Sequence, residues 1–353
     1  MGKTLIVAEK PAAGKDIAKV VGATEEHSGY MEGRQYVVTW AVGHLIGLKE
    51  PQEHDEKYSR WVLEDLPISF GLSDSLKVLP VSRKQYSVIK ALIHRRDIDM
   101  LINAGDAGRE GYLIQEWIYR MVGCRLPKKV LWASSLSKAG IQAAMDNLKD
   151  NSLPEFQGIL REAEARAEGD YLLGYNYSRL LTITRAYKQS LSYGRCQTPL
   201  LYLVCQRDKA VREFKPEPYW SIEATYSKGF KGVLVDDAGK TRKFFDKEEA
   251  DAALRMITGA GKVVEYDKQE KREKAPLLYN LAKLQQHMGR KYSFAPDKTL
   301  KIAQTLYEKY KILSYPRTDS QYLSMDIYGE IEELLESCRF GKFTELIDRI
   351  DMN

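Results

Sequence analysis

Residues 100–111, MLINAGDAGREG, decide the fold of the amino-terminal part of the chain. The run Met100 to Ala104 predicts a buried parallel strand, because it is short, apolar and closed by glycine and polar residues. Helical periodicity follows directly and predicts a helix over 109–122. Thr4 to Ala8 repeats the apolar pattern and precedes a predicted helix over 12–21. Strands and helices therefore alternate, which predicts an α/β fold with an open, mostly parallel sheet and helices on both faces.

Acidic residues stand at the ends of the two clearest strands. Further elements are expected as strands at 36–42 and 129–132, and as helices at 83–94 and 138–148. Open α/β sheets bind their ligands at the carboxyl ends of the strands. Glu9 follows the predicted strand at 4–8, and Asp106 follows the predicted strand at 100–104. We therefore expect these two acids to meet at one edge of the sheet.

The pattern changes along the rest of the chain. Residues 154–214 are helical with few breakers over 155–187, and Pro216 and Pro218 then punctuate the sequence. Half-buried β patterns and a charged linker follow: strands at 219–226, 232–235 and 263–266, a turn at 237–239, and the linker at 268–274. From Pro276 the chain is helical to its end. These changes divide the chain into an α/β domain at 1–152, a helical segment at 153–215, a β-rich segment at 216–274 and a helical segment at 275–353.

Composition excludes several classes of protein. The 353 residues include 54 Lys and Arg against 49 Asp and Glu, a net charge of +5, with 44% hydrophobic and 29% charged residues, as in soluble globular proteins. No apolar run approaches the roughly 18 residues of a membrane span, and no signal peptide is evident. The four cysteines form no CxxC pair, and no Walker A sequence is present. We therefore expect a cytoplasmic protein without a membrane partner, a disulfide framework or ATP use; the charge permits nucleic acid as a partner.

The acids suggest a cation site. Glu9, Asp106 and Glu110, which opens the next helix, offer the oxygen ligands that Mg²⁺ prefers. Such an ion would organise a phosphodiester for transfer. The alternative is that Glu9 is a solvated strand-end acid and that Asp106 is a helix N-cap.

A single tyrosine is a candidate nucleophile. Tyr315 lies between the strand-like run 312–314 and Pro316, and proline restricts the backbone of the residue before it. Its phenol could attack phosphorus, and the planar guanidinium of Arg317 could hold a phosphate. The alternative is a half-buried aromatic side chain at a turn.

Two polar stretches suggest nucleic-acid contacts. In 165–179, Tyr and Arg interleave as in grooves that stack single-stranded bases. In 192–199, Arg195, Gln197 and Thr198 are of phosphate- or base-contacting types. The alternatives are an ordinary amphipathic helix surface, and Thr198 as the N-cap of a helix with proline at its first position. The lone His44 after a strand is expected to be a hydrogen-bonded structural residue.

Taken in chain order, eight segments resemble one family, the type IA DNA topoisomerases, and within it the topoisomerase III branch. They are VAEKP at 7–11, GHL at 43–45, DAGREG at 106–111, LWASSL at 131–136, ARAEGDYLLGYNYSR at 165–179, SYGRCQTP at 192–199, LLYNLAKLQQ at 277–286 and LSYPRTDS at 313–320. The resemblance implies a Toprim α/β domain followed by helical and β-rich segments of the topoisomerase core.

The resemblance also implies a chemistry. Tyr315 is similar to the nucleophile that cuts single-stranded DNA, giving a 5′-phosphotyrosine and a free 3′-hydroxyl, with religation that needs no ATP. Arg317 matches the group on the scissile phosphate, Glu9 a general acid/base, and Lys10 a lysine facing the phosphate. Asp106 and Glu110 match the first and third acids of the family's DxDxE magnesium motif. The residues that match positions along the family's DNA path are Arg166, Asp170, Arg195, Gln197 and Thr198. Such an enzyme works on the nucleoid in the cytoplasm, relaxing or decatenating DNA.

Three departures from the family matter. Gly108 stands where the middle acid of DxDxE is usual, and Tyr112 replaces a common glutamate, so weaker or more magnesium-dependent metal binding is expected. The chain ends soon after Tyr315, which predicts an amino-terminal portion and an incomplete toroid, with a second chain as a candidate partner that supplies the rest. A fragment that binds single-stranded DNA without cutting it is one alternative. A primase or nuclease on the same metal-binding domain is another, and LSYPRTDS argues against it.

Overall fold

The computed structural model describes residues 2–133, 136–185, 189–257, 259, 261–310, 312–323 and 325–350. Contacts divide the chain into two compact units: Met1–Arg195 with Leu277–Asn353, and Cys196–Pro276. All four cysteines are free thiols. Among the described residues, no helix is both long and apolar enough to traverse a lipid bilayer.

A seven-stranded sheet forms the centre of the first unit, in the order β2-β3-β4-β1-β7-β8-β9. Its strands are β1 (Lys3–Ala8), β2 (Glu25–His27), β3 (Tyr30–Glu32), β4 (Tyr36–Trp40), β7 (Ile98–Ala104), β8 (Lys128–Val130) and β9 (Lys149–Asp150). The four central strands, β4, β1, β7 and β8, run parallel, and the edge strands pair antiparallel. The predicted α/β fold is confirmed. The antiparallel edges were not expected, because strands of two or three residues carry too little periodicity to be read from sequence.

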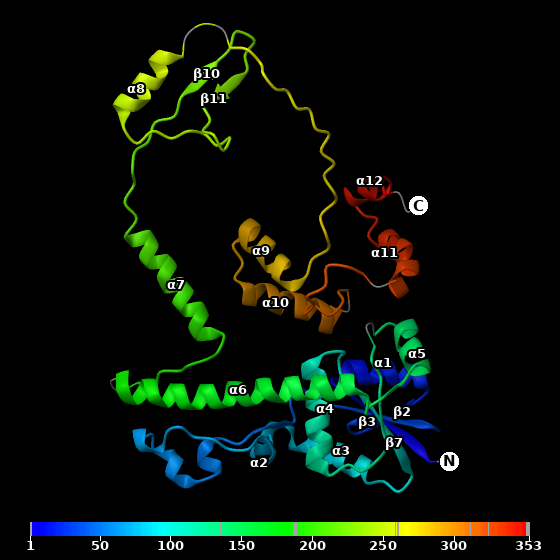
Figure 1. The fold of residues 1–353 in the computed structure, drawn as a ribbon. Coiled ribbons are helices and arrows are strands. Elements are labelled where there is room, and N and C mark those ends of the chain that lie inside the picture. Colours follow the sequence, from blue (N-terminus) through cyan, green and yellow to red (C-terminus); the bar gives the residue numbers. More distant parts are fainter. Residues whose placement is uncertain are drawn as a thin grey trace. The chain divides into compact units, whose positions relative to one another are not determined.

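Helices cover both faces of this sheet (Figure 1). The four helices that do so are α1 (Pro11–Val21), α3 (Arg83–Ile93), α4 (Arg109–Val122) and α5 (Lys138–Asp146). Alternate residues of β1 serve the two faces: Leu5 and Val7 pack with α3 and α4, whereas Ile6 and Ala8 pack with α1 and α5. Burial of β1 on both faces explains its continuous apolar sequence.

A long connection between β4 and α3 reaches α6 (Pro154–Arg185), a helix that packs against α4. The connection contains the antiparallel pair β5 (Ile46–Leu48) and β6 (Leu76–Val78), the short α2 (Leu72–Ser75), and 3₁₀ turns at Pro51–Glu53, Glu56–Ser59, Leu63–Asp65 and Pro80–Ser82. Asn176 of α6 fixes it in place. Its Oδ1 accepts from the amide of Ile68 at 2.6 Å, and its Nδ2 donates to the Ile68 carbonyl at 2.8 Å.

The second unit is small and mostly exposed. It contains α7 (Gln197–Arg212), the hairpin of β10 (Glu223–Thr225) and β11 (Lys231–Val233), and α8 (Lys247–Met256). The predicted turn at 237–239 is confirmed by Gly239, which has a φ of 74° and donates to the carbonyl of Asp236 at 2.9 Å. The predicted strand at 263–266 is wrong. Val264 is 92% exposed, and no neighbouring strand is available to pair with this segment among the described residues.

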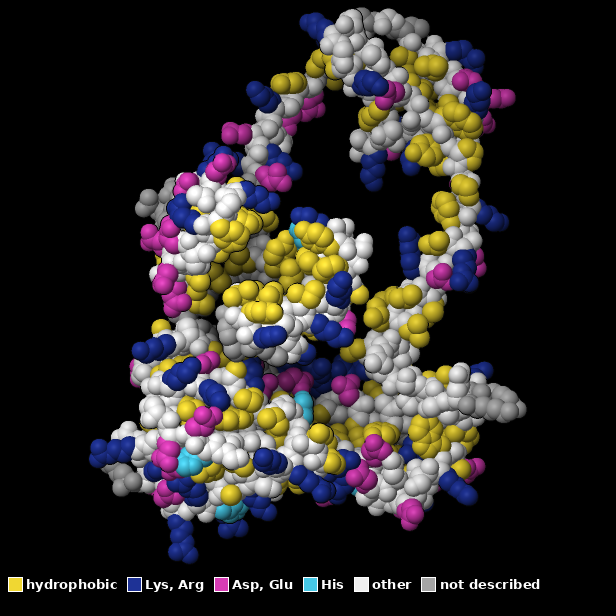
Figure 2. Space-filling view, turned by 180° about the vertical axis from the view of Figure 1, so that it is seen from behind, with side chains coloured by type: hydrophobic (Ala, Val, Ile, Leu, Met, Phe, Trp, Pro, Cys, Tyr) yellow, Lys and Arg dark blue, Asp and Glu magenta, His cyan; other side chains and the backbone are white. Residues whose placement is uncertain are grey.

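The final part of the first unit is helical. It contains α9 (Leu281–Tyr292), α10 (Pro296–Thr305), a π-helical turn at Leu306–Tyr310, a 3₁₀ turn at Met325–Glu330, α11 (Ile331–Ser337) and α12 (Phe343–Ile347). Apolar side chains lie on the surface of these helices (Figure 2). Leu334 and Leu346 are both 52% exposed. The predicted strand-like run at 312–314 is not a strand in the described residues 312–314.

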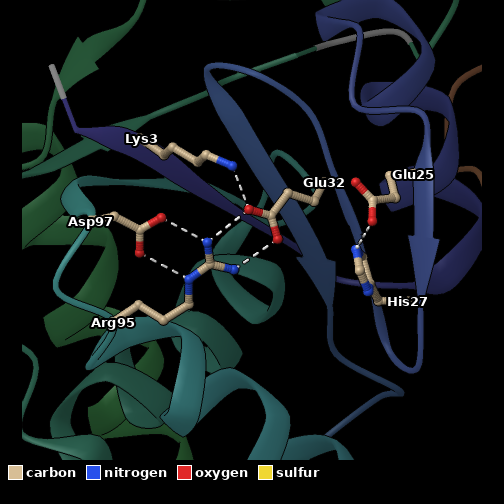
Figure 3. A network of polar contacts seen from close by, with 6 residues as sticks. All are labelled: Lys3, Glu25, His27, Glu32, Arg95 and Asp97. Carbon is tan, nitrogen blue, oxygen red and sulfur yellow. Dashed lines mark hydrogen bonds and ion pairs between the residues drawn. The ribbon is translucent and has the colours of Figure 1, made fainter.

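An ion-pair clamp ties the beginnings of β1 and β7 to β3 (Figure 3). Arg95 donates to both oxygens of Glu32, at 2.8 and 2.7 Å, and to Asp97, which directly precedes β7. Lys3 Nζ, at the start of β1, also bonds the Glu32 carboxylate. The clamp therefore fixes the register of the two strands whose other ends carry Glu9 and Asp106.

Candidate active site

The turn that carries Asp106 is shaped by two glycines. A Cβ at Gly105 would lie 2.5 Å from the carbonyl oxygen of Gly111. A Cβ at Gly111 would lie 2.4 Å from Glu9 Oε2 and 2.5 Å from the carbonyl oxygen of Asp106. Backbone therefore touches backbone, and the absence of side chains lets the end of β7 fold against the first turn of α4.

The two strand-end acids meet as the sequence predicts. The amide of Asp106 donates to Glu9 Oε2 at 3.0 Å, and Lys10 Nζ donates to Asp106 Oδ2 at 2.9 Å. Burial, followed by the negative charge of Asp106, raises the pKa of Glu9 above its ordinary value. Burial lowers the pKa of Lys10, but the hydrogen bond and charge of Asp106 outweigh it, so this pKa is raised. The result is a carboxyl that holds its proton more readily than usual, beside a firmly charged ammonium group.

Tyr315 lies against the same lysine. The Lys10 nitrogen is 3.9 Å from the centre of the Tyr315 ring, and the Tyr307 ring meets Tyr315 edge-on at 5.5 Å. Tyr315 remains 39% exposed, whereas Pro316 beside it is buried. The buried proline anchors the segment, and the exposed phenol stays accessible to a ligand at the strand ends.

The segment after Tyr315 runs back to the start of α9. The Leu281 amide donates to the Thr318 carbonyl at 3.2 Å, and Asn280 Nδ2 donates to the Asp319 carbonyl at 3.2 Å. Arg317, which directly precedes Thr318, is exposed. Its guanidinium is therefore near Tyr315 in sequence and open to solvent.

A row of ion pairs joins α4 to α6 and to the segment beyond α6. Arg166 Nη1 lies 3.2 Å from Glu110 Oε1, and Arg166 Nε lies 3.9 Å from Asp170 Oδ2. Arg195 donates to both oxygens of Asp170, at 2.7 and 3.3 Å. The Arg195 bonds are the main reason that the pKa of Asp170 is lowered. Four residues singled out from the sequence thus form one connected network, here named the Glu110–Arg195 row.

Arg195 is positioned by hydrogen bonds between its own segment and α6. Thr182 Oγ1 accepts from the Leu191 amide at 2.9 Å, and Ser178 Oγ accepts from the Tyr193 amide at 2.8 Å. The segment therefore runs antiparallel along α6, which brings Arg195 back to Asp170. Gln197 and Thr198 belong to the second unit, where α7 begins at Gln197 with Cys196 as its N-cap. Thr198 is thus inside the first turn, and the alternative that made it the N-cap is wrong.

A groove lies beside the Glu110–Arg195 row, between α4 and α6. Its lining includes His44, Glu110, Trp117, Arg166, Asp170 and Tyr171. His44 was expected to be a hydrogen-bonded structural residue. Its side chain is instead exposed at the groove. The signal in the sequence was its position directly after a strand, where α/β sheets place ligand-binding residues.

The carboxylates at the strand ends fit a Mg²⁺ ion that takes only one or two of its ligands from the protein. Mg²⁺ in phosphoryl-transfer sites is held by one or two carboxylates together with substrate phosphates. Glu9 and Asp106 supply such oxygens at adjoining strand ends. Glu110 is engaged by Arg166, and no group of three His, Cys, Asp or Glu side chains is close enough to hold a metal ion within the residues described. A two-carboxylate site is therefore the one that this arrangement favours.

The chain was compared with known proteins. The family model described as "DNA topoisomerase" matches residues 155–350, more than half of the chain, and the "Toprim domain" model matches 4–136. The chain belongs to the type IA DNA topoisomerase family. The resemblance seen in the eight sequence segments is therefore confirmed.

Relatives of this chain include "DNA topoisomerase 3" of Bacillus cereus, which is 38% identical over 99% of this chain and 47% of the relative. The protein of the same name from Bacillus subtilis (strain 168) is 35% identical over 99% of this chain and 48% of the relative. The chain thus spans about half the length of these curated relatives. The structure of full-length topoisomerase I from Thermotoga maritima is similar with a TM-score of 0.61 and 25% identity, over 95% of this chain and 52% of that chain.

Two positions of this chain depart from the family motif, and the structure gives them different surroundings. Gly108 has no atom within 4 Å of a Cβ position, and its φ of −172° is extended backbone open to any residue. It is also the N-cap of α4, so the alternative that made Asp106 the N-cap is wrong. Tyr112 is buried, donates to Asn151 Oδ1 at 2.7 Å and stacks on Phe156. Gly108 is thus an open position in the acidic turn, and Tyr112 is part of the core.

Proposed function

We propose that the chain transiently cleaves and reseals one strand of DNA, with Tyr315 as the nucleophile. One observation carries the proposal. The Tyr315 ring lies 3.9 Å from Lys10 Nζ, and the same nitrogen is 2.9 Å from Asp106 Oδ2. A tyrosine of the carboxyl-terminal helical segment therefore reaches the acidic strand ends of the α/β domain.

In the proposed step, the Tyr315 oxygen attacks a backbone phosphorus. The phenolic proton leaves to solvent, the O–P bond forms, and the bond from phosphorus to the 3′-oxygen breaks. Glu9 gives its proton to the departing 3′-oxygen, a role that its raised pKa favours. Lys10 and Arg317 stabilise the negative charge that grows on the phosphoryl oxygens. The reverse steps reseal the strand, because the phosphotyrosine ester keeps the energy of the original bond.

Magnesium is the proposed cofactor, and Glu9, Asp106 and Glu110 are its proposed ligands. When bound, Mg²⁺ would supply positive charge that neutralises and orients the phosphate. Within the chain itself, Lys10 partly performs this task because its ammonium group is shared between Asp106 and the Tyr315 ring.

The proposed substrate is a single-stranded segment of supercoiled or catenated DNA, on the nucleoid in the cytoplasm. Arginine holds phosphates through its planar fork, and tyrosine rings stack on bases. Support for a DNA path along α6 comes from Arg166 and Asp170 at a groove and from Arg195 bound to the same Asp170. Gln197 and Thr198 at the start of α7 are proposed to continue this path.

The domain roles follow from the same proposal. Residues 1–152 form the Toprim domain, and 153–215 form a DNA-binding helical segment. Residues 216–274 form the first part of the β-rich arch that spans the ring of the family's enzymes, and 275–353 form the part that carries the nucleophile. We further propose that a second polypeptide segment, homologous to the remaining half of the relatives, completes the ring needed for strand passage. The exposed apolar side chains of α7, such as Leu200 at 63% and Leu203 at 62%, support such a partner.

The test is a cleavage assay on single-stranded DNA labelled at its 5′ or its 3′ end, with Mg²⁺ and a denaturing quench. The wild-type chain is expected to become covalently attached to the 5′ end of the downstream fragment, and Tyr315→Phe is expected to yield no adduct. Tyr310→Phe, an exposed tyrosine in the nearby π-helical turn, is the matched control. An adduct in Tyr315→Phe would refute Tyr315 as the nucleophile.

The second candidate function is binding of single-stranded DNA without cleavage. It is favoured by the engagement of the proposed metal ligand Glu110 with Arg166, which leaves one fewer ligand for the metal ion that cleavage is proposed to need. In that case wild type and Tyr315→Phe bind an oligonucleotide equally and neither forms an adduct at any Mg²⁺ concentration.

A further inference from the structure

We propose that the Glu110–Arg195 row is a coupling device: Arg166 holds Glu110 away from the metal site until a DNA phosphate displaces it. Arg166 is then a positioning residue that acts through Glu110. This inference rests on the proposed function, because it assumes that DNA and a divalent ion bind the same chain.

The first support is the connectivity of the row. Arg166 contacts Glu110 at 3.2 Å on one side and Asp170 at 3.9 Å on the other, so it stands between a proposed metal ligand and a proposed DNA contact. Asp170 in turn accepts hydrogen bonds from Nε and Nη2 of Arg195. Because Asp170 is satisfied by Arg195, its hold on Arg166 is the long and weak one. Arg166 is therefore held more closely by Glu110 than by Asp170.

The second support is exposure. The side chains of Glu110, Arg166 and Asp170 are 54%, 42% and 45% exposed. Ion pairs of this exposure contribute little to stability, and water and salt compete with them. A phosphodiester offers arginine a charge-assisted partner that accepts two hydrogen bonds from its planar fork, whereas Glu110 contacts Arg166 through a single oxygen at 3.2 Å. DNA entering the groove beside α6 can therefore take Arg166 from Glu110.

The third support is the state of the acidic turn. Glu9 and Asp106 already adjoin, but among the described residues no third acid gathers with them closely enough for a metal ion. Of the five influences on the pKa of Glu9, which burial dominates, the charge of Glu110 is the smallest. Gly108 contributes no carboxylate, so Glu110 is the only acid within the turn's sequence, 105–111, that can join Asp106. Its release changes a two-carboxylate site into a three-carboxylate site.

Coupling of this kind has a reciprocal consequence. If DNA raises the affinity for the divalent ion, the ion must raise the affinity for DNA by the same factor. Couplings between two sites are commonly fivefold or more. We expect about a tenfold effect here, because the change is one carboxylate ligand and one nearby positive charge.

The experiment measures Mn²⁺ binding by the electron paramagnetic resonance signal of the free ion, in the full chain carrying Tyr315→Phe to prevent cleavage. Mn²⁺ affinity is measured with and without a saturating oligo(dT), and DNA binding is followed separately by fluorescence anisotropy. The expected result is about a tenfold rise in Mn²⁺ affinity with DNA. Adding Arg166→Gln is expected to raise Mn²⁺ affinity without DNA and to reduce the DNA effect below about twofold.

Two further variants separate this mechanism from simpler ones. Arg161→Gln removes the same charge from an exposed position of the same helix and is expected to keep the full DNA effect. Glu110→Gln is expected to bind DNA but to lose the rise in Mn²⁺ affinity. If the rise persists in Arg166→Gln, the DNA phosphates alone supply it and the coupling is refuted while the proposed function stands. If oligo(dT) does not bind at all, both the proposed function and this inference fail.

Discussion

Replacing Glu32 with Gln tests the ion-pair clamp at the beginnings of β1 and β7. Hydrogen bonds from Arg95, and after them the bond from Lys3, lower the pKa of Glu32 to about 2 from its ordinary 4.5. Each pKa unit corresponds to about 1.4 kcal/mol, which gives at most about 3.5 kcal/mol of stabilisation from the ionised carboxylate. Because 13% of the side chain is exposed to screening by solvent, we expect Glu32→Gln to lower the free energy of unfolding by about 2 kcal/mol at pH 7.

The effect has a defined dependence on pH. A carboxyl whose pKa is lowered by folding stabilises the fold fully above its unfolded value, and the stabilisation is lost as pH falls through the folded value. Wild type and Glu32→Gln should therefore differ most above pH 4.5 and converge toward pH 2. The clamp adjoins the starts of β1 and β7, so urea titrations read by hydrogen exchange of peptides from these strands report it directly.

The matched control is Glu25→Gln on the neighbouring strand β2. Glu25 is 73% exposed and contacts His27 at 3.1 Å (Figure 3), so its loss should cost less than about 0.5 kcal/mol. Equal midpoints for the two variants at pH 7 would refute the reasoning. So would a Glu32→Gln difference that stays constant down to pH 2.

Three further predictions concern the acidic turn. Gly111→Ala should lower the free energy of unfolding in urea by about 1–3 kcal/mol and reduce DNA cleavage, because the added Cβ meets backbone at 2.5 Å. Gly108→Ala, whose Cβ lies in open space, should change the free energy of unfolding by less than about 0.5 kcal/mol. Equal costs for the two variants would contradict this geometry. Tyr112→Phe should lower the free energy of unfolding by about 1–2 kcal/mol through the loss of its buried hydrogen bond to Asn151, and it should leave the cleavage rate unchanged. Loss of cleavage activity in a folded variant would show that Tyr112 belongs to the site. In the proposed reaction, deprotonation of Glu9 lowers the cleavage rate as pH rises, and Glu9→Gln should abolish this pH dependence; an unchanged pH–rate profile would exclude Glu9 as the acid. The same variant should stabilise the fold at pH 7 but not below the ordinary carboxyl pKa, because burial and Asp106 raise the pKa of Glu9.

Local patterns predicted the centre of the fold well. The apolar runs of β1 and β7 are buried on both faces of the sheet, so their sequences need no alternation, and the acids that follow them meet as expected. The helix over 109–122 agrees with α4 at both ends, because Gly123 takes the left-handed conformation that stops a helix. These features depend on residues that are neighbours in sequence or on the general geometry of parallel sheets.

Features that depend on distant partners were not predictable in the same way. Val263 to Tyr266 has the composition of a strand, but none of the described residues pairs with it, so it remains exposed. The contact of Tyr315 with Lys10 joins two ends of the first unit, and no periodicity encodes it. The engagement of Glu110 by Arg166 is of the same kind, since each residue alone has an ordinary surface role. Family resemblance supplied these sites where periodicity could not.

The contrast between Gly108 and its neighbours Gly105 and Gly111 has a consequence for protein engineering. Two glycines fill the turn with backbone contacts, so they set its length and admit no variation, while the third faces open space. Form and chemistry are thus assigned to different positions of one short loop. A carboxylate, an amide, a histidine or an unnatural chelating side chain at Gly108 would therefore fit without rebuilding the scaffold and would add a ligand beside the proposed magnesium site. In the acidic turn, Gly105 and Gly111 thus fix the backbone, and the side chain at position 108 can be exchanged.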